Sequence, residues 1–355
     1  MIKSIILENF RNFKKGKFSF SPETTVIIGP NASGKTNILE AIFLLATGKS
    51  FKAKVEEEMI EYSSELARVK GDYLEVILTR GFIDIGKSVP ERVARKKLIV
   101  NGLPKRLIDF AGNLKVVLFG PWDLDLVTQS PSLRRRFLDT VLSQSDREYR
   151  RASLSYEKGL RQRNRLLLRI REEGIPRGNL TFWDQLLIKN GDYISSARQN
   201  FIDFANSHYS LPTLPAGIHY SLDYDKSAIS ETRLEQYREE EVAAATTLVG
   251  PHRDDMIFKI LENRGEPRKS RSLDRFGSRG GQRMGVLWLK LAELAFIEAQ
   301  AGEKPTLLLD DILSELDHEH RKVVLSVVGK QQTIITTADE HFIENFGKIE
   351  IVKLN

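Results

Sequence analysis

The chain has 355 residues, of which 41% are hydrophobic and 29% charged, with a formal charge of +6 and no cysteine. This length predicts one large domain or two coupled domains. The lack of cysteine excludes disulfides, zinc–thiolate sites and cysteine nucleophiles, and the basic balance mildly favours a polyanionic partner. The opening MIKSIILENF has no basic-then-apolar leader, and no apolar run is long enough to span a bilayer. We therefore expect a soluble, cytoplasmic protein without a membrane partner.

Short strands are predicted at 2–7, 17–20 and 24–28, and the third leads into VIIGPNASGKTNILEAI. This segment has the pattern G-x-x-x-x-G-K-T, and apolar residues at helical spacing follow it from 34 to about 47. In such a loop backbone N–H groups cradle phosphates, a lysine reaches the β- and γ-phosphates, and a threonine holds Mg²⁺. A glycine turn with an incidental lysine is the alternative, which the strand before and the helix after disfavour. The expected nucleotide contacts are Gly29, Pro30, Asn31, Ala32, Ser33, Gly34, Lys35, Thr36 and Asn37.

The middle of the chain changes from strands to helices. Residues 67–119 are rich in strand patterns, with Asn101-Gly102 as a hairpin turn. Residues 131–210 carry long, arginine-rich helical patterns that are broken near EEGIPRGN. A strand in GIHYSLDY, an acidic helix around 231–245 and a strand in MIFKIL follow.

The last third alternates between helix and strand, which is typical of a parallel αβ core. Its predicted elements are a helix at 281–300, a strand at 305–310, a helix at 318–329 and a strand at 332–336. The phosphate loop at one end of the chain and this core at the other therefore enclose a mainly helical block.

A second element of nucleotide chemistry is predicted in PTLLLDDILSELD at 305–317. Leu307 to Leu309 form a buried strand, and Asp310 and Asp311 follow at its carboxyl end. One carboxylate there can orient Mg²⁺ through its water, and the next can polarise an attacking water. The alternative is a helix-capping aspartate after a core strand, which the phosphate loop in the same chain disfavours.

The segment SRGGQR at 278–283 is a second glycine-rich stretch at the start of a predicted helix, and Ser278 adds a hydroxyl donor. S-x-G-G-Q is the signature motif of ABC-type ATPases, and SELD at 314–317 resembles their D-loop. This resemblance implies an α/β fold, the ABC-type P-loop ATPase head, in which the signature motif of one subunit closes over ATP bound to another. It implies an ATP-dependent homodimer with contacts in trans from Ser278, Gly280, Gly281 and Gln282.

Four further segments resemble the RecF family of bacterial recombination mediators: ILENFRNF, NILEAIFLLATGKSF, VVLFGPWDLDLVTQSPSLRRRFLD and LVGPHRDD. The resemblance implies a lobe I with a mixed sheet, built from 1–120 and 300–355, and an inserted, mainly helical lobe II at 121–299. It implies ATP and Mg²⁺ as cofactors and weak, DNA-stimulated ATP hydrolysis. It also implies that the protein binds double-stranded DNA at single-stranded gaps, has RecR as a partner and helps to load a recombinase.

The same resemblance assigns roles to single residues. Lys35, Asp310 and Asp311 would serve catalysis, and Thr36 and Asp310 would hold the metal. Arg11 is a candidate contact to a phosphate or base, with a solvated arginine at a strand end as the alternative. His252, Arg253 and Asp254 in GPHRDD either form a structural turn or contribute to the nucleotide site of the dimer.

Three positions depart from the pattern of the family. Asp311 stands where most ABC-type ATPases have glutamate, and its shorter side chain predicts slow hydrolysis. Thr337 takes the place of the switch histidine, since His341 comes too late in IITTADEH. Trp122 replaces a residue that is commonly acidic, and we have no interpretation for it.

The stretch 147–171 carries a basic stripe. At about 100° per residue its six cations fall within an arc of roughly 80° on one helix face, opposite Tyr149, Tyr156, Leu160, Leu167 and Ile170. A row of like charge favours a polyanion such as DNA phosphate, bound without base readout. The alternative is a solvated arm that is neutralised by acidic residues such as Glu235 and Glu239 to Glu241. The six cations are Arg147, Arg151, Lys158, Arg161, Arg165 and Arg169.

Further candidates for contact with a polyanion lie outside this stripe: Arg92, Arg95, Lys96, Lys97, Arg268, Lys269 and Arg271. Two other functions share the phosphate loop. The nucleotide-binding subunit of a transporter would have no use for the basic stripe, and in a P-loop kinase SRGGQ and SELD would be accidents.

Overall fold

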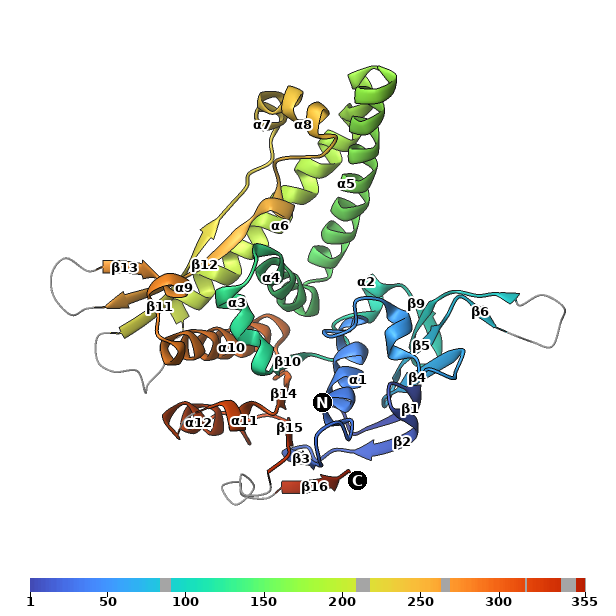
Figure 1. The fold of residues 1–355 in the computed structure, drawn as a ribbon, viewed down its shortest axis with the longest axis vertical. Coiled ribbons are helices and arrows are strands. Elements are labelled where there is room, and N and C mark those ends of the chain that lie inside the picture. Colours follow the sequence, from blue (N-terminus) through green and yellow to red (C-terminus); the bar gives the residue numbers. More distant parts are fainter. Residues whose placement is uncertain (84–90, 209–217, 263–268, 317, 340–348, 355) are drawn as a thin grey trace. The chain divides into compact units, whose positions relative to one another are not determined.

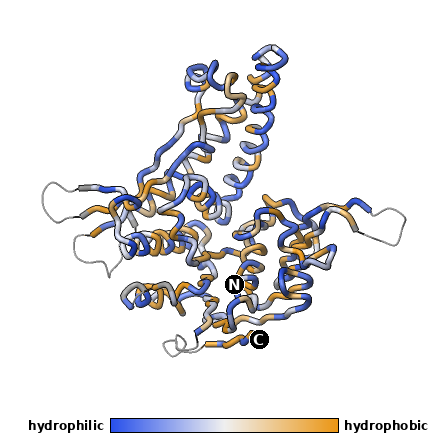
Figure 2. The backbone as a smooth tube through the Cα atoms, in the orientation of Figure 1, coloured by the Kyte–Doolittle hydropathy of each residue, from blue (hydrophilic) through white to orange (hydrophobic). Residues whose placement is uncertain are grey.

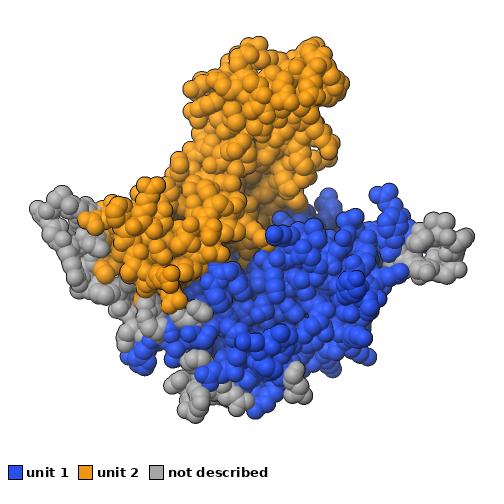
Figure 3. Space-filling model, in the orientation of Figure 1, with its two compact units in different colours: residues 1–123, 297–355 blue, residues 124–296 orange. Residues whose placement is uncertain are grey.

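The computed structural model describes residues 1–83, 91–208, 218–262, 269–316, 318–339 and 349–354 (Figure 1). The chain forms two compact units, coloured separately in Figure 3. Unit 1 comprises residues 1–123 and 297–355, and unit 2 comprises residues 124–296. Unit 1 is thus assembled from both ends of the chain, and unit 2 is one continuous insertion.

A five-stranded parallel sheet of order β10-β14-β15-β3-β16 lies in unit 1. Every residue of the first four of these strands is buried, and their runs of Val, Ile, Leu and Thr are typical of parallel strands covered on both faces. Asp310 lies opposite Thr336, and Thr337 lies opposite Ile28, so the segments after β14, β15 and β3 emerge at one edge. The strands are β3 (Thr24–Ile28), β10 (Val116–Phe119), β14 (Thr306–Asp310), β15 (Thr333–Thr337) and β16 (Ile349–Lys353).

A second sheet of unit 1 is antiparallel, with the order β2-β1-β4-β5-β8-β9. Its strands alternate between buried and partly exposed positions, since one face covers the core. A short pair, β6 (Phe82–Ile83) and β7 (Glu91–Arg92), also lies in this unit. The six strands are β1 (Ser4–Phe10), β2 (Phe13–Ser19), β4 (Leu66–Lys70), β5 (Leu74–Thr79), β8 (Lys96–Val100) and β9 (Leu103–Lys105).

Helix α1 (Lys35–Thr47) packs against β10, β14 and β15 of the parallel sheet and against β4 and β5 of the antiparallel sheet. Because it faces both sheets, every residue from Ile38 to Ala46 is buried, as expected for a helix that is apolar on all sides. The shorter helices of unit 1 are η1 (Glu56–Met59), α2 (Leu107–Phe110), η2 (Pro121–Leu124), α11 (Ile312–Glu315) and α12 (His318–Leu325).

Unit 2 is built around two long helices, α5 (Arg147–Glu173) and α6 (Thr181–His208), which pack against each other. The Asp146 side chain caps α5 by accepting hydrogen bonds from the N–H groups of Glu148 and Tyr149, at 2.8 and 3.1 Å. Gly174 ends this helix in the left-handed conformation, with φ of 67°. Figure 2 shows that hydrophilic residues recur along α5. Three shorter helices lie next to this pair in sequence: α3 (Asp125–Thr128), α4 (Pro131–Ser145) and η3 (Arg177–Leu180).

An antiparallel sheet of order β11-β12-β13 completes unit 2. Its strands are β11 (Ile218–Asp225), β12 (Asp255–Glu262) and β13 (Lys269–Ser272). The remaining helices are α7 (Glu231–Gln236), α8 (Arg238–Ala244), η4 (Pro251–Arg253), α9 (Leu273–Phe276) and α10 (Arg279–Ala301), and α10 continues into unit 1.

The structure corrects several predicted boundaries. The acidic helix of 231–245 is two helices, because Tyr237 leaves the helical conformation at φ −95° and ψ 15°. The helix predicted at 318–329 ends at Leu325 and is preceded by α11, and β16 was not predicted. Helix α10 begins at Arg279, two residues before the predicted start, so that both Gly280 and Gly281 lie in its first turn.

None of the helices in the described part of the chain combines the length and the apolar character that crossing a bilayer requires.

Candidate functional site

The loop between β3 and α1 is shaped by two glycines. Gly34 has φ of 106°, and a Cβ on it would lie 2.7 Å from Asn12 Nδ2 and from Phe13 Cζ. Both the conformation and the space therefore require glycine. A Cβ on Gly29 would lie 2.7 Å from Ser33 Oγ and 2.9 Å from the Leu354 carbonyl oxygen. Within the described part of the chain, Ser33 Oγ is buried without a hydrogen-bond partner, which leaves this hydroxyl available to a ligand.

Lys35 is held across the loop. Its side chain is only 4% exposed, and its ammonium group donates hydrogen bonds to the carbonyl oxygens of Gly29 and Pro30, at 2.8 and 3.2 Å. Lys35 Nζ also lies 4.0 Å from Asp311 Oδ2. The cation is thus fixed between the loop and the end of β14.

The carboxylate of Asp310 lies beside the first turn of α1. Thr36 Oγ1 donates to Asp310 Oδ1 at 3.1 Å, and Thr336 Oγ1 donates to the same oxygen at 2.6 Å. Burial raises the pKa of the Asp310 carboxyl, and the hydrogen bonds from Thr336 and Thr36 oppose this shift. The structure therefore brings Thr36 and Asp310, the two proposed metal ligands, into direct contact from distant parts of the sequence.

Asp311 occupies a turn that is strained for a residue with a side chain. Its φ of 47° is left-handed, and it caps α11. The backbone N–H of Asp311 donates to Thr336 Oγ1 at 3.0 Å, and Ser314 Oγ donates to the Asp311 carbonyl at 2.7 Å. The Asp311 carboxylate is 35% exposed, so it is accessible beside the buried Asp310.

The structure describes only some of the other residues of unit 1 that the sequence singled out. Leu316 of the SELD segment is buried, whereas Asp317 and His341 lie outside the described residues. The Thr337 hydroxyl donates to the Asp339 carbonyl at 3.2 Å and accepts the Asp339 N–H at 3.1 Å. Thr337 thus stabilises the turn that follows β15. Trp122 stacks on Phe51, with ring centroids 5.1 Å apart.

Arg11 lies in the β1–β2 turn, but its guanidinium is engaged within the protein. Nε and Nη2 donate to the two carboxylate oxygens of Glu40, at 2.8 and 2.6 Å, and Nη1 donates to the Glu58 carbonyl at 2.6 Å. Glu40 is fully buried in α1 and also accepts a hydrogen bond from the Ser50 hydroxyl. The guanidinium therefore neutralises a buried carboxylate, a role that neither sequence alternative described.

The signature segment of unit 2 forms the N-terminus of α10. Ser278 Oγ accepts a hydrogen bond from the Gly281 N–H at 3.1 Å, so this serine caps the helix. Ser278 and Gly280 are exposed, and a Cβ on Gly280 would meet no atom closer than 4.0 Å. Packing therefore does not explain glycine at 280. Gln282 is 8% exposed and points inward, donating to the carbonyl oxygens of Leu273 and Asp274.

The basic stripe lies on the exposed side of α5. Of the five residues predicted on the opposite side, Tyr149, Tyr156, Leu167 and Ile170 are buried and Leu160 is half-buried. Half of its cations pair along the helix: Arg151 with Glu148, Arg161 with Glu157, and Arg169 with Glu173. Such exposed pairs are screened by water and contribute little to stability. Lys158 and Arg165 are exposed and have no hydrogen-bond or ion-pair partner among the described residues.

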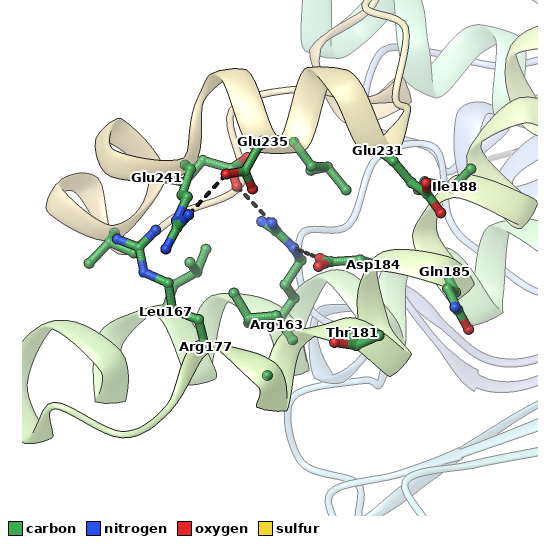
Figure 4. A pocket seen from close by; sticks show the side chains of 15 residues that line it. Arg163, Leu167, Arg177, Thr181, Asp184, Gln185, Ile188, Glu231, Glu235 and Glu241 are labelled. Carbon is green, nitrogen blue, oxygen red and sulfur yellow. Dashed lines mark hydrogen bonds and ion pairs between the residues drawn. The ribbon is translucent and has the colours of Figure 1, made fainter.

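Three of the acidic residues considered as neutralising partners of the stripe, Glu235, Glu239 and Glu241, pair with other arginines. Figure 4 shows Glu235 and Glu241 at a cavity of about 420 Å³ in unit 2, where Arg163 lies between Asp184 and Glu241. Glu235 pairs with Arg238, and Glu239 pairs with Arg177 and Arg238. Acids of α5 itself therefore take the place expected for Glu235 and Glu239 to Glu241.

The other basic candidates differ in whether they have acidic partners. Arg95 pairs with Glu57 at 2.8 Å, and Lys96 pairs with Glu56, whereas Lys97 and Arg92 are exposed. Arg271 lies over the Phe276 ring. Arg268 lies outside the described residues, and Lys269 is described only as part of β13.

The GPHRDD segment forms a buried polar cluster in unit 2. The Asp254 carboxylate is fully buried and accepts hydrogen bonds from Arg198 Nη1 at 3.0 Å, from the Tyr224 hydroxyl and from the Ser227 N–H at 2.7 Å. His252 contacts the Tyr156 hydroxyl at 2.8 Å and the Thr247 carbonyl at 3.0 Å, and burial lowers its pKa to about 4. These contacts favour the structural-turn interpretation for His252 and Asp254.

Two residues of the site were missed from the sequence. Thr336 contacts both Asp310 and the N–H of Asp311, and Asn12 donates to the Ser33 carbonyl at 3.0 Å. Thr336 looked like any β-branched residue of a buried strand. For Asn12, the only signal was its place beside Arg11 in NFRN, a composition that is typical of a turn.

The parallel sheet, the glycine loop at the end of β3 and the paired aspartates at the end of β14 define a P-loop protein of the ATPase-head class. The family model "RecF/RecN/SMC N terminal domain" matches residues 1–354. The chain is 36% identical over 378 residues to a DNA replication and repair protein RecF of Herpetosiphon aurantiacus, covering 97% of this chain and 95% of the relative. A RecF of Lachnoclostridium phytofermentans is also 36% identical, over 365 residues and the same shares of both chains.

A solved structure described as the recombination mediator protein RecF-ATP in the RecFOR pathway superposes with a TM-score of 0.82. It is 32% identical and covers 96% of this chain and 92% of that chain. The chain therefore belongs to the RecF/RecN/SMC family, and within it to the RecF proteins. The predicted fold class, an ABC-type P-loop head, is confirmed, and the transporter alternative is not favoured.

Proposed function

We propose that this chain binds ATP in the loop of residues 29–36, dimerises around it, and acts on duplex DNA in recombinational repair. The observation that carries the proposal is the meeting of Lys35, Thr36, Asp310 and Asp311 at one edge of the parallel sheet. Thr36 and Asp310 are 274 residues apart in the sequence, and the RecF relatives are named for DNA replication and repair.

The residues at this edge fit a nucleotide with Mg²⁺. Hydroxyl and carboxylate oxygens are the protein ligands that Mg²⁺ prefers, and Thr36 Oγ1 and Asp310 Oδ1 are 3.1 Å apart. When bound, Mg²⁺ would neutralise charge on the phosphates. Lys35 would bind the β- and γ-phosphates, and Asp311 would orient the attacking water. Because aspartate is shorter than glutamate, we propose slow hydrolysis, so that bound ATP marks a lasting state of the dimer.

The signature segment supports a composite site in the dimer. Its exposed Ser278 and Gly280 stand at the N-terminus of α10, where backbone N–H groups and the helix dipole favour an anion. Together with Gly281, they would close over the ATP held by another copy of the chain. Gln282 would support this turn from within, because its amide donates to carbonyl groups of α9.

Duplex DNA is the proposed polyanion for the stripe of α5. Lys158 and Arg165 are exposed cations without partners in the described part of the chain, so they are free to neutralise phosphates. Contacts of this kind give binding that depends on salt and not on base sequence. By analogy with the RecFOR relatives, we propose gap-containing duplex as the target and RecR as a protein partner.

Size-exclusion chromatography tests the dimer. Asp311→Asn should slow hydrolysis and elute as a dimer with ATP and Mg²⁺, whereas Lys35→Ala should remain monomeric and lose about 100-fold or more in hydrolysis. Mixing Lys35→Ala with Ser278→Arg should restore part of the activity, since a mixed dimer contains one composite site without either substitution. Elution of Asp311→Asn as a monomer with ATP would contradict the proposal.

Duplex binding at several salt concentrations tests the stripe. Replacing Lys158 and Arg165 by alanine should weaken binding and reduce the slope of log affinity against log salt by about 0.9 for each phosphate that is no longer neutralised. Lys226→Ala, an exposed lysine outside α5, is the matched control. Unchanged slopes would exclude the stripe, and hydrolysis that duplex DNA does not stimulate would contradict the proposed DNA dependence.

A further inference from the structure

Asn12, in the turn between β1 and β2, bridges the phosphate loop and the first turn of α1. Its Nδ2 donates to the carbonyl oxygen of Ser33 at 3.0 Å, and its Oδ1 accepts a hydrogen bond from Asn37 Nδ2 at 2.8 Å. The orientation of the Asn12 amide is set by chemistry, because a carbonyl oxygen only accepts and must therefore face the NH₂ group. Asn12 lies in the distant β1–β2 turn and thus links the phosphate loop to α1, which follows the loop directly in sequence.

The hydrogen bond to Ser33 sets the direction of the next N–H group. In a trans peptide the C=O of Ser33 and the N–H of Gly34 point to opposite sides of the bond. Holding the carbonyl toward Asn12 therefore turns the Gly34 N–H away from the β1–β2 turn. Gly34 is buried, and its N–H has no acceptor among the residues that the structure describes. A buried N–H without an acceptor is rare and calls for a ligand.

The fit between Asn12 and Gly34 is close. A Cβ on Gly34 would lie 2.7 and 2.8 Å from the amide atoms of Asn12, so only glycine admits this side chain. Ser33 Oγ, on the same peptide segment, is also buried without a partner in the described part of the chain. Two polar groups next to the Asn12 contact thus have no partner among the residues that the structure describes, and both are available to a ligand.

The turn that carries Asn12 is held from outside the loop. Asn9 and Arg11 have left-handed φ of 50° and 54°, conformations that cost energy for residues with a side chain. The Arg11 N–H donates to the Met59 carbonyl at 2.9 Å, and the Glu61 N–H donates to the Asn9 carbonyl at 2.8 Å. These bonds fix the turn independently of any nucleotide, so that Asn12 is in place before a ligand arrives.

We propose that Asn12 is a positioning residue for the nucleotide site. It holds the Ser33–Gly34 peptide so that the Gly34 N–H faces a phosphate of the nucleotide, and Asn37 keeps the Asn12 amide in the required orientation. This inference rests on the proposed binding of ATP by the same loop.

The test is titration calorimetry with ATP and ADP on Asn12→Asp. Aspartate has the shape of asparagine and keeps an acceptor for Asn37, but it places an oxygen against the Ser33 carbonyl. We expect affinity for both nucleotides to fall about tenfold or more, because the missing donor and the new repulsion favour a rotated peptide. The melting temperature without nucleotide should stay near that of the unmodified protein. KM for ATP should rise more than kcat falls, since the N–H contacts phosphate in the ground state as well as the transition state.

Asn9→Asp is the matched control, because it introduces the same charge near the end of β1, at a side chain with no hydrogen bond to the loop among the described residues. Asn37→Ala should give a smaller loss than Asn12→Asp, since it removes only the orienting bond. Affinity of Asn12→Asp within twofold of the unmodified protein would overturn the inference, as would an equal loss in Asn9→Asp. If the unmodified protein itself bound no nucleotide, both this inference and the proposed function would be wrong. If the unmodified protein bound nucleotide, Lys35→Ala did not, and Asn12→Asp kept its affinity, the proposed function would stand and only the role of Asn12 would be wrong.

Discussion

Two buried aspartates, Asp310 in unit 1 and Asp254 in unit 2, show how differently a polar cluster can be completed. Asp254 is neutralised by Arg198 and accepts hydrogen bonds from Tyr224 and Ser227. Asp310 receives only the hydroxyls of Thr36 and Thr336 and has no ion pair within the described residues. A buried carboxylate whose charge is matched stabilises the fold, whereas one whose charge is unmatched is suited to a cation.

The difference extends to the neighbours of each aspartate. Around Asp254, Arg198 also pairs with Asp139 at 2.8 Å, and His252 has partners on both ring nitrogens. In the phosphate loop, which precedes the Thr36 that contacts Asp310, Ser33 Oγ has no partner in the described part of the chain. The cluster of unit 2 is closed on itself, and the cluster of unit 1 is open to a ligand.

The largest expected effect is on stability and concerns the closed cluster. Asp254→Ala should lower the free energy of unfolding of unit 2 by about 3–5 kcal/mol, because it leaves the buried Arg198 with an incomplete set of partners. Chemical denaturation followed by circular dichroism measures this change. Asp225→Ala, an exposed aspartate on β11, is the control and should cost less than about 0.5 kcal/mol. Equal effects of the two substitutions would remove the distinction between closed and open clusters.

Substitutions of Arg11 test whether its ion pair with Glu40, close to the phosphate loop, serves stability and not nucleotide binding. Arg11→Met should lower the free energy of unfolding by about 3 kcal/mol, since Glu40 is fully buried and loses its counter-ion. Arg11→Met combined with Glu40→Met should recover part of that loss, because a hydrophobic pair leaves no buried charge. Denaturation and nucleotide titration of the same samples separate the outcomes. A large loss of ATP affinity at unchanged stability would instead identify Arg11 as a nucleotide contact.

His252 gives the closed cluster a dependence on pH. Burial lowers its pKa to about 4, below the 6.5 of an ordinary histidine, so between these values the unfolded chain binds a proton that the folded chain does not. Stability should therefore fall by about 2–3 kcal/mol as the pH drops from 6.5 to 4, allowing for the partly exposed ring. His252→Gln should remove this part of the pH dependence in denaturation curves, whereas His219→Gln, at an exposed position, should retain it. Parallel curves for the two variants would contradict the assignment.

The smallest effect concerns the open site and should appear in activity, not stability. Thr336→Val keeps the shape of the side chain but removes the hydroxyl that contacts Asp310 Oδ1 and the Asp311 N–H. The rate of ATP hydrolysis should fall about tenfold, as expected when a hydrogen bond to a charged group is removed. Thr336→Ser should restore most of the rate, because it retains the hydroxyl. A full rate in the valine variant would show that Thr336 contributes packing alone.

The sequence identified the elements whose signals are local. The strand and helix around G-x-x-x-x-G-K-T, the buried run LLL before Asp310, and the hairpin at Asn101-Gly102 all depend on neighbouring residues, and the structure contains each of them. The predicted ends of helices and strands were less accurate. No glycine or proline marks the helix break at Tyr237, so the sequence did not predict it. Strand β16 was not predicted either, because it is stabilised by its pairing with the distant β3.

The tertiary structure decided which polar residues belong together. Spacing could not show that Thr336 reaches both aspartates, that Asn12 contacts the loop, or that Arg11 neutralises Glu40, because each pair joins elements far apart in the chain. Nor could it show that acids of α5 itself, and not Glu235 or Glu239, accompany the basic stripe. The sequence by itself determined the chemistry of the site, since glycine, lysine, threonine and aspartate at fixed spacing define a phosphate loop. Only the fold determined which of these charges are matched, because matching depends on burial and on partners that distant strands and helices supply.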